Sequence, residues 1–115
     1  MDAIDRDFIA QLESDLSPDD LRTLLAVFRA DAERLTRDIA SAVAAGDATA
    51  AQRSRHALAG AASAVGAVHL ERAVRAQMAA PATAQSEDGV TVLRALAFEA
   101  VSDLTTILST TIRDA

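Results

Sequence analysis

One stretch of the chain decides the fold. Residues 17–47 read SPDDLRTLLAVFRADAERLTRDIASAVAAGD. Apolar side chains recur in this stretch at intervals of three and four residues, which is the periodicity of one face of an α-helix. The stripe comprises Leu21, Leu24, Leu25, Phe28, Ala32, Leu35, Ile39, Ala42 and Val43. It predicts a long amphipathic helix over about residues 18–45, with its apolar face against a core.

Both ends of this helix carry sequence signals. Ser17 can cap the first turn, and Pro18 suits the first helical position. At the other end, Gly46 suits a left-handed cap, and Asp47 can cap the helix that follows. Because so short a connection brings the chain straight back, the next helix is expected to run antiparallel to the first.

The remaining sequence extends this pattern to an all-α domain. Of the 115 residues, 28 are alanine, and there is no Trp or Tyr, a composition that favours closely packed helices over a sheet. A short N-terminal helix is expected from the stripe Ile4, Phe8, Leu12 and Leu16. We predict a single domain over residues 1–115, an up-down-up-down antiparallel four-helix bundle with this additional short helix. The helices are expected at about 4–16, 18–45, 48–65, 68–80 and 90–112, with Pro81 opening a loop over about 81–89.

Charge and composition exclude several classes of function. The net charge is −6, all eleven basic residues are arginine, and no basic stripe is present. Nucleic acid and anionic membranes are therefore not expected as partners. The absence of cysteine excludes disulfides and thiolate chemistry. No signal peptide precedes the first helix, and no apolar run reaches the ~20 residues of a membrane span, so a cytoplasmic protein is expected.

The expected helix at 48–65 contains His56, one of two histidines. Its inward face is predicted to be Ala51, Leu58, Ala61, Ala62 and Val65. His56 lies two residues before Leu58, about 200° around the helix, so its ring is expected to point away from the core. The residues expected beside it on the exposed face are Gln52, Arg53, Ala59, Gly60 and Ser63.

An exposed imidazole is a nucleophile, and a phosphoryl group is a natural electrophile for a histidine without catalytic neighbours. Gly60, one turn further on, costs helix stability but leaves room for a bulky partner. The spacing alone is weak evidence, because a single exposed histidine is usually an ordinary surface residue. His69 lacks the four-residue spacing of a helical metal site. It is expected at the surface or at a helix start, and no metal site is predicted.

A wider pattern around His56 resembles a known family. The run His56-x-Leu58-x-Gly60-x-Ala62-x-x-x-Gly66-Ala67 is similar to the signature of histidine phosphotransfer (HPt) domains. Upstream, the pattern Leu24-Leu25-x-x-Phe28-x-x-Asp31-x-x-x-Leu35 and the Gly46-Asp47 turn resemble the second helix of that family and its turn. Downstream, Leu70-x-x-Ala73 resembles the helix after the site. The resemblance covers roughly residues 4–80, and the last helix matches only as a helix of suitable length.

The resemblance implies a phosphocarrier in a multistep phosphorelay and not a turnover enzyme. His56 would accept a phosphoryl group from a receiver-domain aspartate or a histidine kinase and pass it on. The implied partners are receiver domains of response regulators, a hybrid histidine kinase, or both. They would dock near His56 on a monomer, at Gln52, Arg53, Arg55, Ala59, Gly60 and Ser63. No cofactor is expected on this chain, since the family uses the Mg²⁺ of the receiver.

Two positions depart from the family pattern. Ala59 stands where the family commonly has a lysine that helps to neutralise the phosphoryl group. Arg53 or Arg55 could supply this charge instead. Some members place a glutamine on the following helix near the site, and the corresponding position here is Met78, with Gln77 adjacent. The glutamine's role is therefore not carried over to this chain.

Three alternatives remain open. The missing lysine could mark an HPt-like adaptor that binds a receiver or kinase without efficient transfer. The bundle could instead be a structural dimerisation module, which would have a large apolar patch away from His56. A phosphotransfer domain attached to a chemotaxis kinase is a weaker third possibility, because the sequence contains no further domain.

Overall fold

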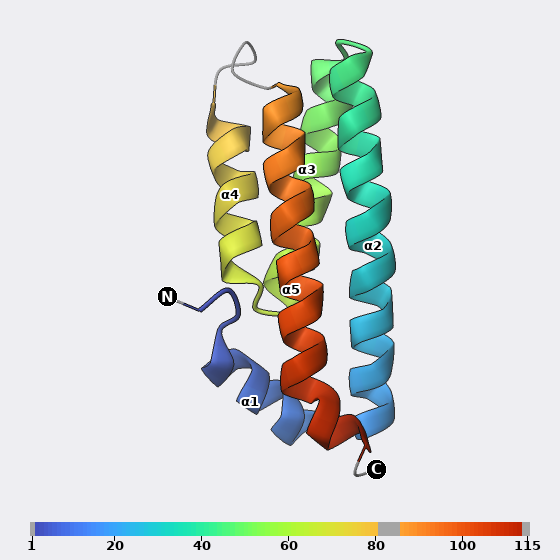
Figure 1. Cartoon of the computed structure of the whole chain (residues 1–115), viewed down its shortest axis with the longest axis vertical. Helices are drawn as coiled ribbons and strands as arrows, with labels where there is room; N and C mark the ends of the chain where they lie inside the picture. The colour runs from blue at the N-terminus through green and yellow to red at the C-terminus, as the bar shows by residue number, and fades with distance from the viewer. Residues whose placement is uncertain (1, 81–85, 114–115) are drawn as a thin grey trace.

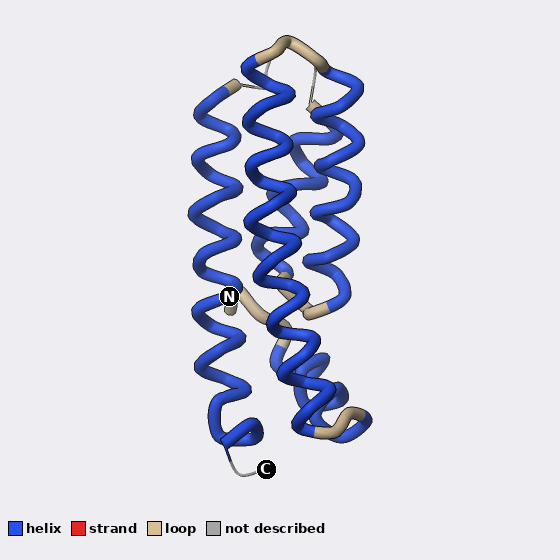
Figure 2. Tube along the Cα trace, turned by 90° about the vertical axis from the view of Figure 1, so that its right-hand side faces the viewer, coloured by secondary structure: helices blue, strands red, loops and turns tan. Residues whose placement is uncertain are grey.

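The computed structural model describes residues 2–80 and 86–113, and every regular element among them is a helix (Figure 2). The predicted all-α class is confirmed. The helices are α1 (Arg6–Asp15), α2 (Pro18–Ala44), α3 (Ala48–Ala64), α4 (Val68–Ala79) and α5 (Glu87–Arg113). None of the helices in these described ranges is long and apolar enough to cross a membrane.

Four of the helices lie side by side and form a ring. Helix α2 packs against α3 and α5, and α4 packs against both α3 and α5. Figure 1 shows α2 and α5 along the full height of the bundle, with α1 below α4. The centre of the ring is filled by side chains that are almost completely buried, among them Leu21, Ile39, Leu58, Leu70, Leu93 and Leu104. In this ring, the edge formed by α3 and α4 lies opposite the edge formed by α2 and α5.

The signals predicted at the ends of α2 and α3 are present. The Ser17 hydroxyl accepts a hydrogen bond from the Asp20 backbone N–H at 3.1 Å, and the Asp47 carboxylate accepts one from Ala50 at 3.0 Å. Gly46 adopts a φ of +69°, the left-handed conformation expected at the end of α2. These contacts satisfy backbone groups that a helix end leaves unpaired and fix the α2–α3 turn.

Helix α1 is attached to the bundle at the turn between α3 and α4. The Asp5 backbone N–H donates to the Gly66 carbonyl at 2.8 Å, and the Phe8 ring lies where a side chain on Gly66 would begin. The predicted α1 stripe is only partly correct, since Ile9 is buried whereas Phe8 is 37% exposed. Because Phe8 lies over the glycine, its outer face stays open to solvent while Ile9 enters the core.

Helix α5 begins at Glu87, three residues before the predicted position, so residues 87–89 are helical and not part of a loop. Glu87 and Asp88 favour this earlier start, since acidic residues stabilise the positive end of the helix dipole. The predicted loop residues 81–85, including Pro81, lie outside the described part of the chain. Helix α4 ends at Ala79, close to the predicted end.

Candidate functional site

The outward face of α3 carries His56. The histidine, Gly60 and Ser63 are all exposed, whereas Ala51, Leu58, Ala62 and Val65 on the predicted inward face are buried. Ala61, also predicted inward, is half-buried. This arrangement follows from helical geometry, because residues three and four apart share a face and His56 falls outside the apolar stripe.

His56 lies at the edge of a shallow surface hollow between α3 and α4. The hollow has a volume of about 710 Å³ and is lined by Ala48, Thr49, Gln52, Arg53, His56, Met78 and Ala80. Gln52 closes one side by donating from its Nε2 to the Met78 carbonyl at 2.9 Å, which ties α3 to the end of α4. Gln52 is half-buried, and Arg53 is exposed. The hollow therefore places one imidazole and one guanidinium at an open surface.

Gly60 lies one turn beyond His56 in an open part of the surface. A Cβ atom built on Gly60 would meet no atom of the protein within 4 Å, and its φ is not in the left-handed region. Neither packing nor backbone conformation within this chain therefore requires glycine here. Glycine inside a helix costs about 0.8–1.0 kcal/mol relative to alanine, so Gly60 carries a cost that no contact with the described residues explains.

Two residues expected at the docking surface are inside the protein, which corrects the sequence prediction. Arg55 is 0% exposed and Ala59 is 1% exposed, so neither side chain can contact a partner in this structure. Arg55 donates from Nε to the Gln77 side-chain oxygen at 3.1 Å, and Gln77 Nε2 donates to the Gly89 carbonyl at 3.0 Å. These two bonds connect α3, α4 and the start of α5.

The sequence contained a signal for this burial. Ala51, Arg55, Leu58 and Ala62 follow one another at intervals of four, three and four residues, so Arg55 belongs to the inward stripe. The prediction missed it because a charged residue is rarely fully buried. Burial of the guanidinium lowers the pKa of Arg55 below its usual value, because removal from water disfavours the charged form.

His69, the second histidine, lies at the start of α4 and links two helices. Its Nδ1 is 3.1 Å from a carboxylate oxygen of Glu99 on α5, and its ring is half-buried. The predicted location at a helix start is correct, but the link to Glu99 was not foreseen. Within residues 2–80 and 86–113, no group of three or more His, Asp or Glu side chains is placed to hold a metal ion.

Comparison with known families agrees with this geometry. The family model described as Hpt domain matches residues 23–108, which is well over half of the chain. The chain belongs to the Hpt domain family, and the resemblance derived from the His56 motif is confirmed. Domains of this family carry phosphoryl groups on histidine in phosphorelays, interact with receiver domains and kinases, and are in general not enzymes. The comparison with curated proteins found no match, and neither did the comparison with solved structures.

Proposed function

We propose that this protein is a cytoplasmic phosphocarrier in which His56 accepts a phosphoryl group and relays it between receiver-domain aspartates, or from a histidine kinase to a response regulator. One observation carries this proposal: His56 is exposed beside Gly60, where a Cβ would meet nothing within 4 Å. A protruding nucleophile next to an empty surface suits attack on a phosphoryl group that another protein presents.

In the proposed reaction, an unprotonated imidazole nitrogen of His56 attacks the phosphorus of an aspartyl phosphate. The N–P bond forms as the P–O bond to the aspartate breaks, and the released carboxylate keeps the bonding electron pair. The second transfer reverses these changes on another aspartate. Mg²⁺ held by the receiver would neutralise the phosphoryl oxygens, and the proposal assigns no cofactor to this chain.

The proposal assigns the local positive charge to Arg53. Ala59 offers none, and the buried Arg55 cannot reach the surface. Arg53 lines the same hollow as His56 and is exposed. The proposed docking surface consists of Gln52, Arg53, Gly60 and Ser63 around His56. The proposal includes a monomeric state and a single domain of up-down-up-down topology.

Two assays test the proposal. One labels the protein chemically with phosphoramidate, and the other measures phosphoryl transfer to the unphosphorylated protein from a panel of phosphorylated receiver domains. Wild type is compared with His56→Gln and with the matched control His69→Gln, which removes the other histidine. Wild type and His69→Gln should each gain one acid-labile, base-stable phosphoryl group, whereas His56→Gln should gain none. Equal labelling of His56→Gln and wild type would refute the assignment.

The adaptor alternative has one observation in its favour: among the described residues that line the hollow, Arg53 is the only arginine. Replacement by Arg53→Lys, which keeps the charge, and Arg53→Gln, which removes it, separates the two functions. A phosphocarrier should lose transfer rate in Arg53→Gln and keep it in Arg53→Lys. An adaptor should bind a phosphorylated receiver in all three forms and never acquire phosphohistidine.

A further inference from the structure

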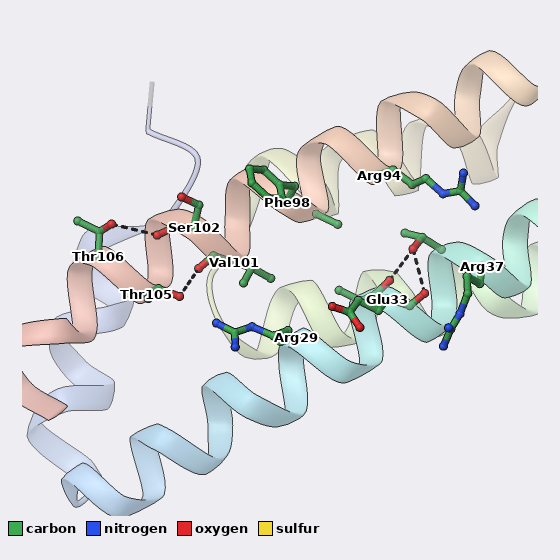
Figure 3. A pocket seen from close by; sticks show the side chains of 12 residues that line it. Arg29, Glu33, Arg37, Arg94, Phe98, Val101, Ser102, Thr105 and Thr106 are labelled. Atoms are coloured by element: carbon green, nitrogen blue, oxygen red, sulfur yellow. Dashed lines mark hydrogen bonds between the residues drawn. The ribbon is translucent and has the colours of Figure 1, made fainter.

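A second surface lies on the α2–α5 edge of the bundle, opposite the edge that carries His56. A groove of about 780 Å³ runs between these helices, and its buried floor includes Ala32 and Ala97. Both of these floor residues are small, so the helices leave a channel that larger side chains would fill. Figure 3 shows the rim, with Phe98 and Arg94 on α5 and Arg29, Glu33 and Arg37 on α2.

The groove is apolar inside although several of its residues are polar. Thr36, Thr105 and Thr106 each donate their hydroxyl hydrogen to a carbonyl four residues earlier in their own helix, at 2.7–3.1 Å. With these hydroxyls already bonded, the threonines offer the groove mainly their methyl groups. Phe98 is 78% exposed, the most exposed large apolar side chain in the described residues. An aromatic ring held in water beside an apolar channel is typical of a binding surface.

The charge of the rim differs from that of the whole protein. The net charge of the chain is −6, yet the groove is lined by three arginines and a single acidic residue, Glu33. Among the described residues, Arg29, Arg37 and Arg94 form no ion pair within 4.0 Å. These cations therefore remain available to a negatively charged partner.

The groove is elongated. A second hollow, of about 340 Å³, continues it toward the end of α5 and shares Arg29 and Thr105 with it. Together the hollows follow α2 from Arg22 to Arg37, a length of about 22 Å at 1.5 Å per residue. This length fits about 15 residues of helix better than a compact small molecule.

We propose that the α2–α5 groove binds an acidic amphipathic helix of a partner protein, whose apolar face packs beside Phe98 and whose carboxylates pair with the rim arginines. A second copy of this chain fits less well, because a two-fold interface would bring the same arginine-rich patch of both subunits together. The proposed site lies across the bundle from His56, so the helix could stay bound while a receiver occupies the phosphotransfer face.

The probe is a synthetic helical peptide of about 15 residues with leucines at positions i, i+3, i+4 and i+7 and glutamates on both flanks. Binding is measured by fluorescence anisotropy, and the affected amides are mapped by NMR. A peptide with lysine in place of glutamate and a scrambled peptide of equal composition serve as controls. The acidic peptide should bind with shifts confined to α2 and α5, and both controls should bind at least about tenfold more weakly.

Substitutions in the protein test the same groove independently of changes in the peptide. Phe98→Ala and the double variant Arg29→Gln/Arg37→Gln should each weaken peptide binding at least about tenfold, since they remove the aromatic anchor or the charges. Val92→Ala is the matched control: Val92 is 49% exposed on α5 but lies outside the groove. It should leave binding unchanged. Circular dichroism verifies that each variant is folded. Phosphoramidate labelling of His56 should be the same in all variants, so failure of the groove proposal would be distinguishable from failure of the proposed phosphocarrier function.

Several results would overturn the proposal. Equal affinity for the acidic and lysine peptides, no binding of the acidic peptide, or full binding by Phe98→Ala would exclude specific recognition by the groove. Decanoate, a small amphiphilic anion, is tested as a separate probe. If it binds in the groove and no peptide does, the ligand class is a small amphiphilic anion and not a helix. Sedimentation equilibrium that shows a wild-type dimer, dissociated by Phe98→Ala, would assign the groove to a second copy of this chain.

Discussion

Replacing Gly60 with alanine should stabilise the protein. The glycine lies inside α3, has no positive φ, and its Cβ position is free of contacts within 4 Å. Alanine therefore adds no clash and removes the cost of a mid-helix glycine, so the free energy of unfolding should rise by about 0.8–1.0 kcal/mol. At about 2.1 cal/mol/K of unfolding entropy per residue, a chain of 115 residues should gain about 3–4 °C in Tm.

Two other glycines supply controls for this measurement. Gly46 has a φ of +69° with open space around it, so Gly46→Ala isolates the backbone cost and should destabilise by about 1–2 kcal/mol. Gly66 has a φ of +68°, and a Cβ would lie 2.9 Å from the Phe8 ring, so Gly66→Ala should cost more than Gly46→Ala. Urea denaturation and thermal scans followed by circular dichroism give all three values.

The same position separates stability from function. Gly60→Leu should remain folded, because its side chain extends into solvent, but it should slow phosphotransfer with a receiver while phosphoramidate labelling of His56 continues. A Gly60→Ala protein that is less stable than wild type would refute the assignment of open space at this position. A Gly60→Leu protein that exchanges phosphoryl groups with receivers at the wild-type rate would refute the role of clearance for a partner.

Three further predictions concern the interior and the ends of α3. Arg55→Ala should lower the free energy of unfolding by about 2–5 kcal/mol, because it empties a buried volume, and Arg55→Met, which fills most of that volume, should cost clearly less. Equal losses in urea denaturation would show that the bond to Gln77 dominates. Asp47→Ala should cost about 0.5–2 kcal/mol through loss of the helix cap, while Asp47→Asn should restore most of it; two equally stable variants would contradict a capping role. Leu58→Ala should cost about 2–5 kcal/mol without removing phosphoramidate labelling of His56 at temperatures where the variant is folded; loss of labelling in the folded variant would contradict this separation.

Local sequence patterns predicted much of the fold. The stripe of α2, its start at Ser17-Pro18 and the Gly46-Asp47 turn depend on interactions between residues near one another in the sequence, and the structure contains each of them. The location of His56 outside the buried stripe follows from the same periodicity. Its role as phosphoacceptor is still a prediction, because it depends on a partner.

Features that depend on contacts between distant helices were not predictable in this way. Arg55 follows the spacing of the inward stripe, but its burial also requires Gln77 from α4 as a hydrogen-bond partner. The buried floor of the groove between α2 and α5 includes Ala32 and Ala97, and no pattern within either helix specifies that these two residues line one groove. The link between His69 and Glu99 likewise joins residues on separate helices.

The attachment of the N-terminal segment determines where a fused protein would leave this domain. Ala3 and Ile4 are buried, and the Asp5 N–H bond to Gly66 holds the segment at the turn between α3 and α4. Figure 1 shows this end of the chain about half-way along the bundle and not at either tip. A tether joined there would start beside the middle of the long axis, so a linker of moderate length could bring its cargo to either end of the domain. Pulling on such a tether would load the α3–α4 turn through the Asp5 bond to Gly66, which makes this junction suited to a reporter of local opening at α1.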